Sequence, residues 1–160
     1  MEIQKIEGLI YQLQGHRVML DRDLAELYGV ETGALNRAVK RNSLRFPSDF
    51  MFQLKPEEWE NLKCQFGISR WGGDRAIPHA FTEHGVAMLS SVLNSLQAIT
   101  ANIEIMLAFT RLRGMLAEQR QLVVRLNELE GRYDAQFKDV FAAIRQLMEP
   151  PVTPKKKIGF

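Results

Sequence analysis

The chain has 160 residues, of which 46% are hydrophobic and 25% are charged, with a formal net charge of +2. That is the composition of a globular protein with one core and an appendage, and no apolar run approaches the roughly 20 residues that span a membrane. Residues 1–11 mix charged and apolar side chains and do not resemble a signal peptide. Its single cysteine, Cys64, excludes an intramolecular disulfide and a cysteine-based zinc site. We therefore expect a cytoplasmic protein without metal or other cofactor, in which Cys64 is buried.

Residues 8–20 alternate between apolar and polar side chains around Gly15, which predicts a short β-hairpin. A short helix should follow, with Asp21 as its N-cap and Gly29 as its left-handed stop. Thr32 should cap a second short helix. In this second helix the inward residues are expected to be Leu35, Ala38 and Val39, and the outward ones Asn36, Arg37, Lys40 and Arg41.

Short elements of both kinds follow and complete the N-terminal head. We expect strands at residues 50–54 and 80–82, a helix at 56–66 with proline in its first turn, and an amphipathic helix at 83–96. The fold class is therefore α+β, with a head over residues 1–97.

From residue 98 to residue 148 the chain has no proline and continuous helical periodicity. A straight helix of this length would reach roughly 75 Å, too far for the head to cover, so self-association or a helical partner is expected. The apolar stripe is wider than a two-stranded coiled coil needs, so either three or more helices meet or the segment folds back near Gly131. The expected oligomerisation residues are Leu112, Met115, Leu122, Leu126, Leu129, Tyr133, Val140, Ile144 and Leu147. Residues 149–160, rich in proline and lysine, should form a disordered tail.

The strongest local signal is residues 21–41, whose pattern is typical of a helix-turn-helix with a second helix suited to a DNA major groove. From Thr32 to Ser48 there are four basic residues and no acidic one. Backbone amides near Thr32 could donate to a phosphate, and Asn36 and Arg37 could read base edges. The residues expected to neutralise phosphates are Lys40, Arg41 and Arg45. A structural helical hairpin with a solvated basic face remains the alternative.

The loop at residues 69–75 is a second candidate DNA contact. Arg70 and Arg75 could reach the backbone or an adjacent groove, and Trp71 could stack on a base. The alternative for Trp71 is that its indole covers the core.

Enzymatic interpretations are weak, and we expect none to apply. The three histidines, His16, His79 and His84, have no carboxylate cluster with which to complete a metal site. No nucleophile, base and orienting group can be assembled, and no phosphate-binding glycine loop is present. A nuclease would need a divalent metal ion and would have to rely on the scattered acids Asp21, Asp23 and Asp49.

Several blocks in order resemble the phage KilA-N superfamily, in the branch named for the N-terminal domain of a phage "open reading frame six" product. The resemblance covers roughly residues 6–113. Its blocks are residues 17–25 (RVMLDRDLA), 27–30 (LYGV), Leu35-Asn36, 39–42 (VKRN), 45–47 (RFP), 49–54 (DFMFQL), 69–73 (SRWGG), 81–83 (FTE) and 85–93 (GVAMLSSVL). His79 and His84 replace the Tyr and Gln of many relatives, which argues against a function for these histidines.

The resemblance implies an α+β DNA-binding domain of phages and prophages, often joined to variable C-terminal modules with regulatory or antirepressor-like roles. We therefore expect a protein that binds double-stranded DNA, sequence-specifically or generally, as a transcriptional regulator or antirepressor, and that forms a homo-oligomer. The alternative is a protein-interaction module whose helical arm captures a regulatory partner.

Overall fold

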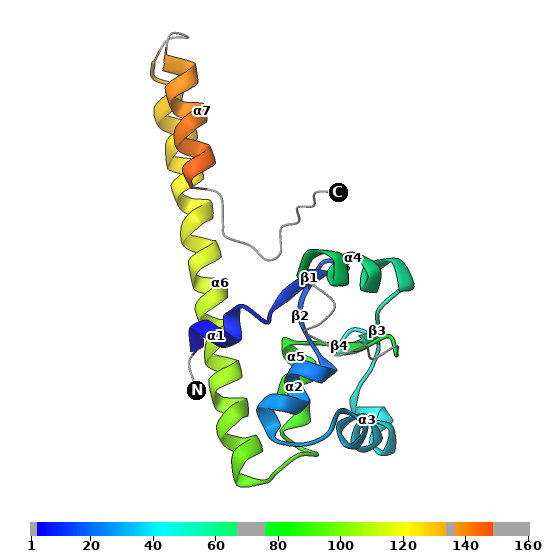
Figure 1. Ribbon diagram of the computed structural model, residues 1–160. Coiled ribbons are helices and arrows are strands. Elements are labelled where there is room, and N and C mark those ends of the chain that lie inside the picture. Colours follow the sequence, from blue (N-terminus) through cyan, green and yellow to red (C-terminus); the bar gives the residue numbers. More distant parts are fainter. Residues whose placement is uncertain (1–2, 67–75, 134–136, 149–160) are drawn as a thin grey trace. The chain divides into compact units, whose positions relative to one another are not determined.

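The structure is a computed structural model that describes residues 3–66, 76–133 and 137–148 (Figure 1). These residues divide into a first compact unit up to Phe109 and a second from Thr110. The first unit is α+β, as predicted from the sequence. It extends past the expected boundary at residue 97 because the first turns of the long helix pack within it.

The first unit is built on a four-stranded antiparallel sheet with the strand order β1-β2-β4-β3. Its strands are β1 (Tyr11–Leu13), β2 (His16–Leu20), β3 (Met51–Gln53) and β4 (His79–Thr82). Strands β1 and β2 form the predicted hairpin, with Tyr11 opposite Val18. The strands predicted at 50–54 and 80–82 are confirmed as β3 and β4.

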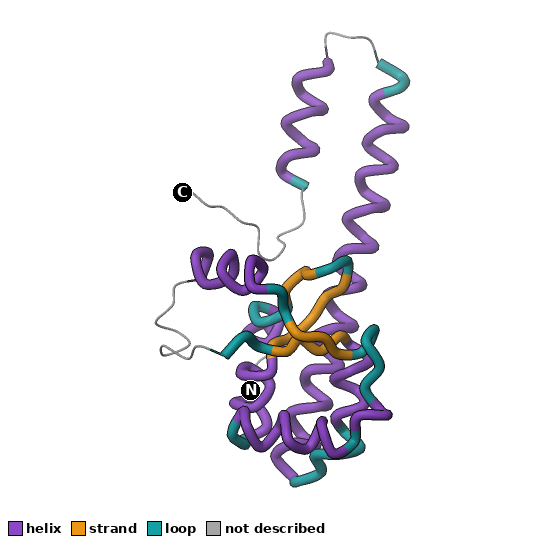
Figure 2. Tube along the Cα trace, turned by 90° about the vertical axis from the view of Figure 1, so that its right-hand side faces the viewer, coloured by secondary structure: helices purple, strands orange, loops and turns teal. Residues whose placement is uncertain are grey.

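Helices surround this sheet. They are α1 (Ile3–Glu7), α2 (Asp21–Tyr28), α3 (Thr32–Arg41), α4 (Pro56–Phe66), α5 (Glu83–Leu89) and the first turns of α6 (Leu96–Glu130), with a 3₁₀ turn η1 at Ser43–Arg45. Both views place α4 near the upper end of the sheet and the α2–α3 pair below it (Figures 1 and 2). None of the helices in the described ranges is both long and apolar enough to cross a membrane.

Alternation along the strands buries both faces of the sheet. Val18 and Leu20 of β2 lie in one core cluster with Trp59 and Leu62 of α4. On the other face, Phe81 of β4 packs edge-to-face against the buried Phe46, with ring centroids 6.0 Å apart. Burying each such side chain contributes about 1.5–3 kcal/mol, so the sheet anchors the elements on both sides.

Helix α5 is shorter than expected and ends at Leu89 instead of continuing to residue 96. The hydroxyl groups of Ser90 and Ser91 donate to the carbonyls of Ala87 and Met88, which competes with continuation of the helix. A new helix, α6, then begins, and the Ser95 hydroxyl accepts from the amide of Ala98 in its first turn.

The prediction for Cys64 was wrong, because its side chain is exposed. Trp59 and Leu62 form the buried face of α4, and Cys64 lies about 140° around the helix from Trp59. A helix that covers a sheet on one side leaves its other side in solvent.

In the second unit the long helix does not continue through Gly131. Helix α6 ends at Glu130, and α7 (Lys138–Leu147) returns beside its last turns (Figure 2). Arg145 of α7 donates to Asn127 Oδ1, 2.6 Å from Nη2, and pairs with Glu130. Of the two arrangements left open by the sequence, the structure has the hairpin.

This hairpin buries little of its apolar surface. Leu126 and Phe141 are its buried residues, and Tyr133 packs against the Phe141 ring. Of the other expected oligomerisation residues, Leu112, Met115 and Ile144 are partly exposed, and the exposed ones are Leu122, Leu129, Tyr133, Val140 and Leu147.

Candidate nucleic-acid interface

The α2–α3 pair forms a tight helical hairpin. Gly29 ends α2 in the left-handed conformation (φ 74°), and the amide of Val30 donates to the Ala25 carbonyl at 3.0 Å. An L side chain at Gly29 would be strained by this φ and would also meet the Gln97 side chain. The predicted left-handed stop is confirmed, and three residues separate the helices, as in a helix-turn-helix.

Both predicted N-caps are wrong. Helix α2 begins at Asp21 with Leu20 in the cap position, and α3 begins at Thr32 with Glu31 in the cap position. Neither cap residue makes a side-chain capping bond. The Asp21 side chain instead accepts hydrogen bonds from residues far from it in the sequence.

The Asp21 carboxylate is buried between α2, α3 and β4. Its Oδ2 accepts from the Asn36 side-chain amide at 3.0 Å and from the His79 backbone amide at 3.1 Å. The His79 ring nitrogen Nδ1 lies 3.5 Å from the same oxygen. Burial acts to raise the pKa of Asp21, but the bonds from His79 and Asn36 together outweigh it and lower that pKa.

The predicted outward position of Asn36 therefore needs correction. Its side chain is only partly exposed and its amide points to Asp21. Asn36 thus holds α3 against α2, and its amide would have to leave Asp21 to read a base.

The remaining outward residues of α3 lie as predicted. Leu35, Ala38 and Val39 are buried, whereas Arg37, Lys40 and Arg41 are exposed. Within the ranges that the structure describes, no ion pair engages these three cations.

Two cations at this surface also touch their neighbours. The guanidinium of Arg37 folds back over Gly33, where an added Cβ would lie 3.3 Å from its Nη1. Arg45, exposed in η1, reaches the Ser91 hydroxyl at 3.5 Å. We call Arg37, Lys40, Arg41 and Arg45 the α3 basic face.

Of the other residues predicted to contact DNA, the structure describes only Thr32. Thr32 is partly exposed at the start of α3, on the same helix as the basic face. Arg70, Trp71 and Arg75 lie outside the described residues.

A second polar anchor was not predicted from the sequence. The buried Asn102 of α6 donates to the Tyr28 hydroxyl and to the Val86 carbonyl, each at 3.2 Å. Burial raises the pKa of Tyr28, against a smaller opposing effect of the Asn102 bond. Asn102 thereby links α2 and α5 to α6. The sequence could not predict this, because a single asparagine in an apolar stripe does not indicate which residues it will bond.

Leu44 was also missed. Its side chain is 99% exposed in the middle of η1, between Arg41 and Arg45. The sequence feature that could have identified Leu44 is an apolar residue inside the basic stretch.

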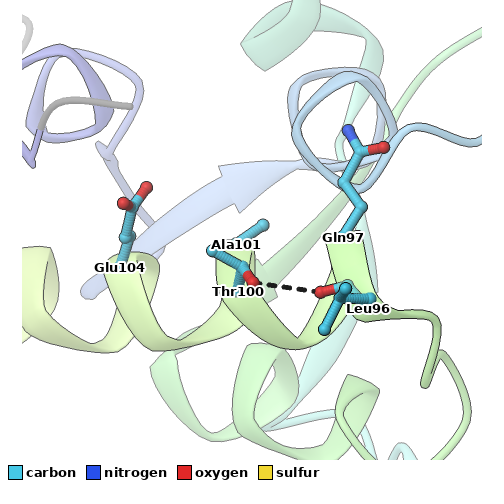
Figure 3. A pocket seen from close by; sticks show the side chains of 5 residues that line it. All are labelled: Leu96, Gln97, Thr100, Ala101 and Glu104. Carbon is cyan, nitrogen blue, oxygen red and sulfur yellow. Dashed lines mark hydrogen bonds between the residues drawn. The ribbon is translucent and has the colours of Figure 1, made fainter.

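An apolar pocket of about 490 Å³ opens along α6 (Figure 3). It is lined by Leu96, Gln97, Thr100, Ala101 and Glu104. These residues include one carboxylate but no histidine, cysteine or lysine with which it could form an acid–base or nucleophilic pair. Across the described part of the chain, no three histidine, cysteine or acidic residues group in a way that could hold a metal ion.

The fold and this surface define a small α+β domain that presents cations on the second helix of a tight helical hairpin. A family model, described as the ORF6N domain, matches residues 8–92. The match covers more than half of the chain and runs from β1 to α5, so the chain belongs to the ORF6N domain family. No curated protein and no solved structure matches the chain.

Proposed function

We propose that this protein binds double-stranded DNA through the α3 basic face and acts as a transcriptional regulator or antirepressor of phage type. The observation that carries the proposal is the set of exposed cations on α3 and η1, without an ion-pair partner for Arg37, Lys40 or Arg41 among the described residues. Membership of the ORF6N domain family supports a phage origin. The KilA-N resemblance of the same blocks supports DNA as the ligand.

The dimensions of α3 suit this role. Its ten residues make a helix about 15 Å long, and a major groove about 12 Å wide admits one α-helix. Buried Leu35, Ala38 and Val39 hold the inner side of α3, so its cations would meet DNA without reordering of the helix. Arg37 would read guanine edges, and Lys40, Arg41 and Arg45 would neutralise phosphates.

We further propose that the α6–α7 hairpin pairs with the hairpin of a second copy. Leu122, Leu129, Val140 and Leu147 are between 41% and 86% exposed, and a two-helix hairpin cannot cover them by itself. Two hairpins would bury this surface in a four-helix arrangement. Pairing would also join two weakly binding heads and raise their effective affinity for DNA.

Fluorescence anisotropy with a labelled random duplex tests the DNA-binding proposal. The variant Arg37→Ala/Lys40→Ala/Arg41→Ala should lose at least about tenfold in affinity near 0.1 M salt, because three phosphate or base contacts disappear.

The matched control is Lys55→Ala/Arg120→Ala/Arg125→Ala, which removes three exposed cations elsewhere. It lowers the net charge equally and should bind within about twofold of the wild type, since only long-range attraction changes. If both variants lost the same affinity for DNA, net charge alone would explain the binding, and the assignment of the binding surface to α3 would be contradicted.

Sedimentation equilibrium tests the pairing of hairpins. The full chain should be a dimer or larger, and Leu129→Glu/Val140→Glu should shift it to monomer. A monomeric wild type would favour the rival proposal, in which the hairpin captures a different helical protein.

A further inference from the structure

Leu44 has an unusual position for a large apolar side chain. It is 99% exposed, more than any other large hydrophobic residue that the structure describes. Scattered apolar residues on a protein surface need no explanation in general. Leu44, however, lies in a hydrogen-bonded turn inside the α3 basic face, and the cations beside it limit which kinds of partner it could contact.

The turn that carries Leu44 is tied on both sides. The Arg45 amide donates to the Asn42 carbonyl at 2.9 Å, and the Asn42 side chain donates to the Ala38 carbonyl at 2.8 Å. Immediately after the turn, Phe46 is buried against Phe81. Since the flanking backbone is already ordered, placing Leu44 against a partner would cost little conformational entropy.

The charges around Leu44 favour a partner that carries negative charge. Arg41 and Arg45 are exposed beside it, and no acidic residue occurs between Thr32 and Ser48. An apolar protein groove would leave these cations without compensation. A base step in duplex DNA offers apolar base faces bordered by phosphates on both strands, which complements one apolar side chain between arginines.

We propose that Leu44 is a wedge that enters the minor groove and partly unstacks one base step while α3 lies in the adjacent major groove. The inference rests on the proposed DNA binding. Leu44 lies in η1, three residues beyond the end of α3 at Arg41, so with α3 in the major groove it would lie near the phosphate strand that borders that groove. Insertion would kink the duplex by about 20–90° and favour flexible pyrimidine–purine steps.

The experiment uses the full-length protein and two labelled duplexes. One carries 2-aminopurine at a central TA step, whose fluorescence rises on unstacking, and the other carries donor and acceptor dyes at its ends to report bending. Wild type should raise the 2-aminopurine signal and the transfer efficiency. Leu44→Ala should lose both signals and about tenfold or more in affinity, because one buried leucine side chain is removed.

Two further variants distinguish loss of a wedge from a general effect of shortening an exposed leucine. Leu44→Met keeps an apolar side chain of similar reach and should retain both signals, whereas Leu96→Ala, which truncates a leucine that is 81% exposed on α6, should behave as wild type. The salt slope of binding should be the same for Leu44→Ala and wild type, because the phosphate contacts remain.

The outcomes distinguish the wedge from the proposal beneath it. Salt-dependent binding by wild type with no unstacking or bending would overturn the wedge and leave DNA binding intact. Unstacking and bending that survive in Leu44→Ala would also overturn it. Absence of binding by wild type would overturn both.

Discussion

The side-chain amide of Asn36 donates a hydrogen bond to the buried Asp21 carboxylate across 3.0 Å. The same oxygen accepts from the His79 backbone amide, so one carboxylate joins α3 and β4 to the start of α2. The orientation of the α3 basic face therefore depends on a buried charge that would itself make no contact with DNA.

Replacing that charge should weaken the fold in a pH-dependent way. The pKa of Asp21 is lower in the folded protein than its ordinary value of 3.8, so the carboxylate stabilises the fold above that pH. The contribution is lost as the pH falls through the lowered pKa. Asp21→Asn should reduce the free energy of unfolding at neutral pH by about 1–3 kcal/mol, and the difference should shrink in acid.

Urea unfolding of both proteins from neutral pH to about pH 3 measures this difference. Asp49→Asn removes an exposed carboxylate and should change the free energy of unfolding by less than about 0.5 kcal/mol. A deficit for Asp21→Asn that stayed constant with pH would argue against an ionised Asp21 as the stabilising group.

Gly85 of α5 is a second sensitive position. An added Cβ would clash with the backbone carbonyl oxygen of Phe50, so α5 or the segment that leads into β3 would have to move. Gly85→Ala should destabilise the protein by at least about 1–3 kcal/mol. In contrast, Gly114→Ala lies in α6 with open space around it and should stabilise by about 0.5–1 kcal/mol. Thermal unfolding should show shifts of opposite sign, and equal shifts would refute the close approach at Gly85.

The second unit can be probed through Phe141. Together with Leu126 it forms the buried part of the hairpin, so Phe141→Ala should expose α7 and speed hydrogen exchange of its amides. Exchange in the sheet of the first unit should stay unchanged. Gln146→Ala truncates an exposed side chain of α7 outside the apolar surface proposed for pairing and serves as the control. Unchanged protection of α7 in Phe141→Ala would mean that other contacts hold the hairpin.

Arg37 and Lys40 should differ in what they contribute to DNA recognition. If Arg37 reads guanine edges, Arg37→Ala should lower the discrimination between DNA sequences by about 1–3 kcal/mol. Lys40→Ala should weaken binding to all sequences alike and flatten the salt slope by about one. Selection from a random-sequence library followed by titration measures both effects. The same loss of discrimination in both variants would place base reading outside Arg37.

Local sequence patterns predicted much of the first unit. Alternation around Gly15 gave the hairpin, Gly29 gave the left-handed stop, and helical spacing gave the buried face of α3. These features depend on neighbours in sequence. The end of α5 also had a local cause, but the hydroxyls of Ser90 and Ser91 interrupt a stripe that otherwise continues to residue 96.

Long-range contacts account for what the sequence did not predict. Asp21 was predicted as an N-cap because aspartate often caps a helix and this one precedes a helical stripe. Its actual partners, His79 and Asn36, reach it only when β4 and α3 lie next to α2. The hairpin in the second unit was one of two open alternatives, because heptad spacing continues past Gly131 and does not distinguish a partner helix in another chain from α7. Contacts such as Arg145 with Asn127 exist only once the chain has turned.

The salt dependence of binding between the wild-type protein and a random duplex tests the central claim most directly. With four cations on the α3 basic face, the logarithm of the association constant should fall with the logarithm of salt concentration with a slope of about −3 or steeper. Binding that ignores salt between about 50 and 200 mM, or no binding at all, would contradict a DNA-binding head and would shift attention to a protein partner of the hairpin.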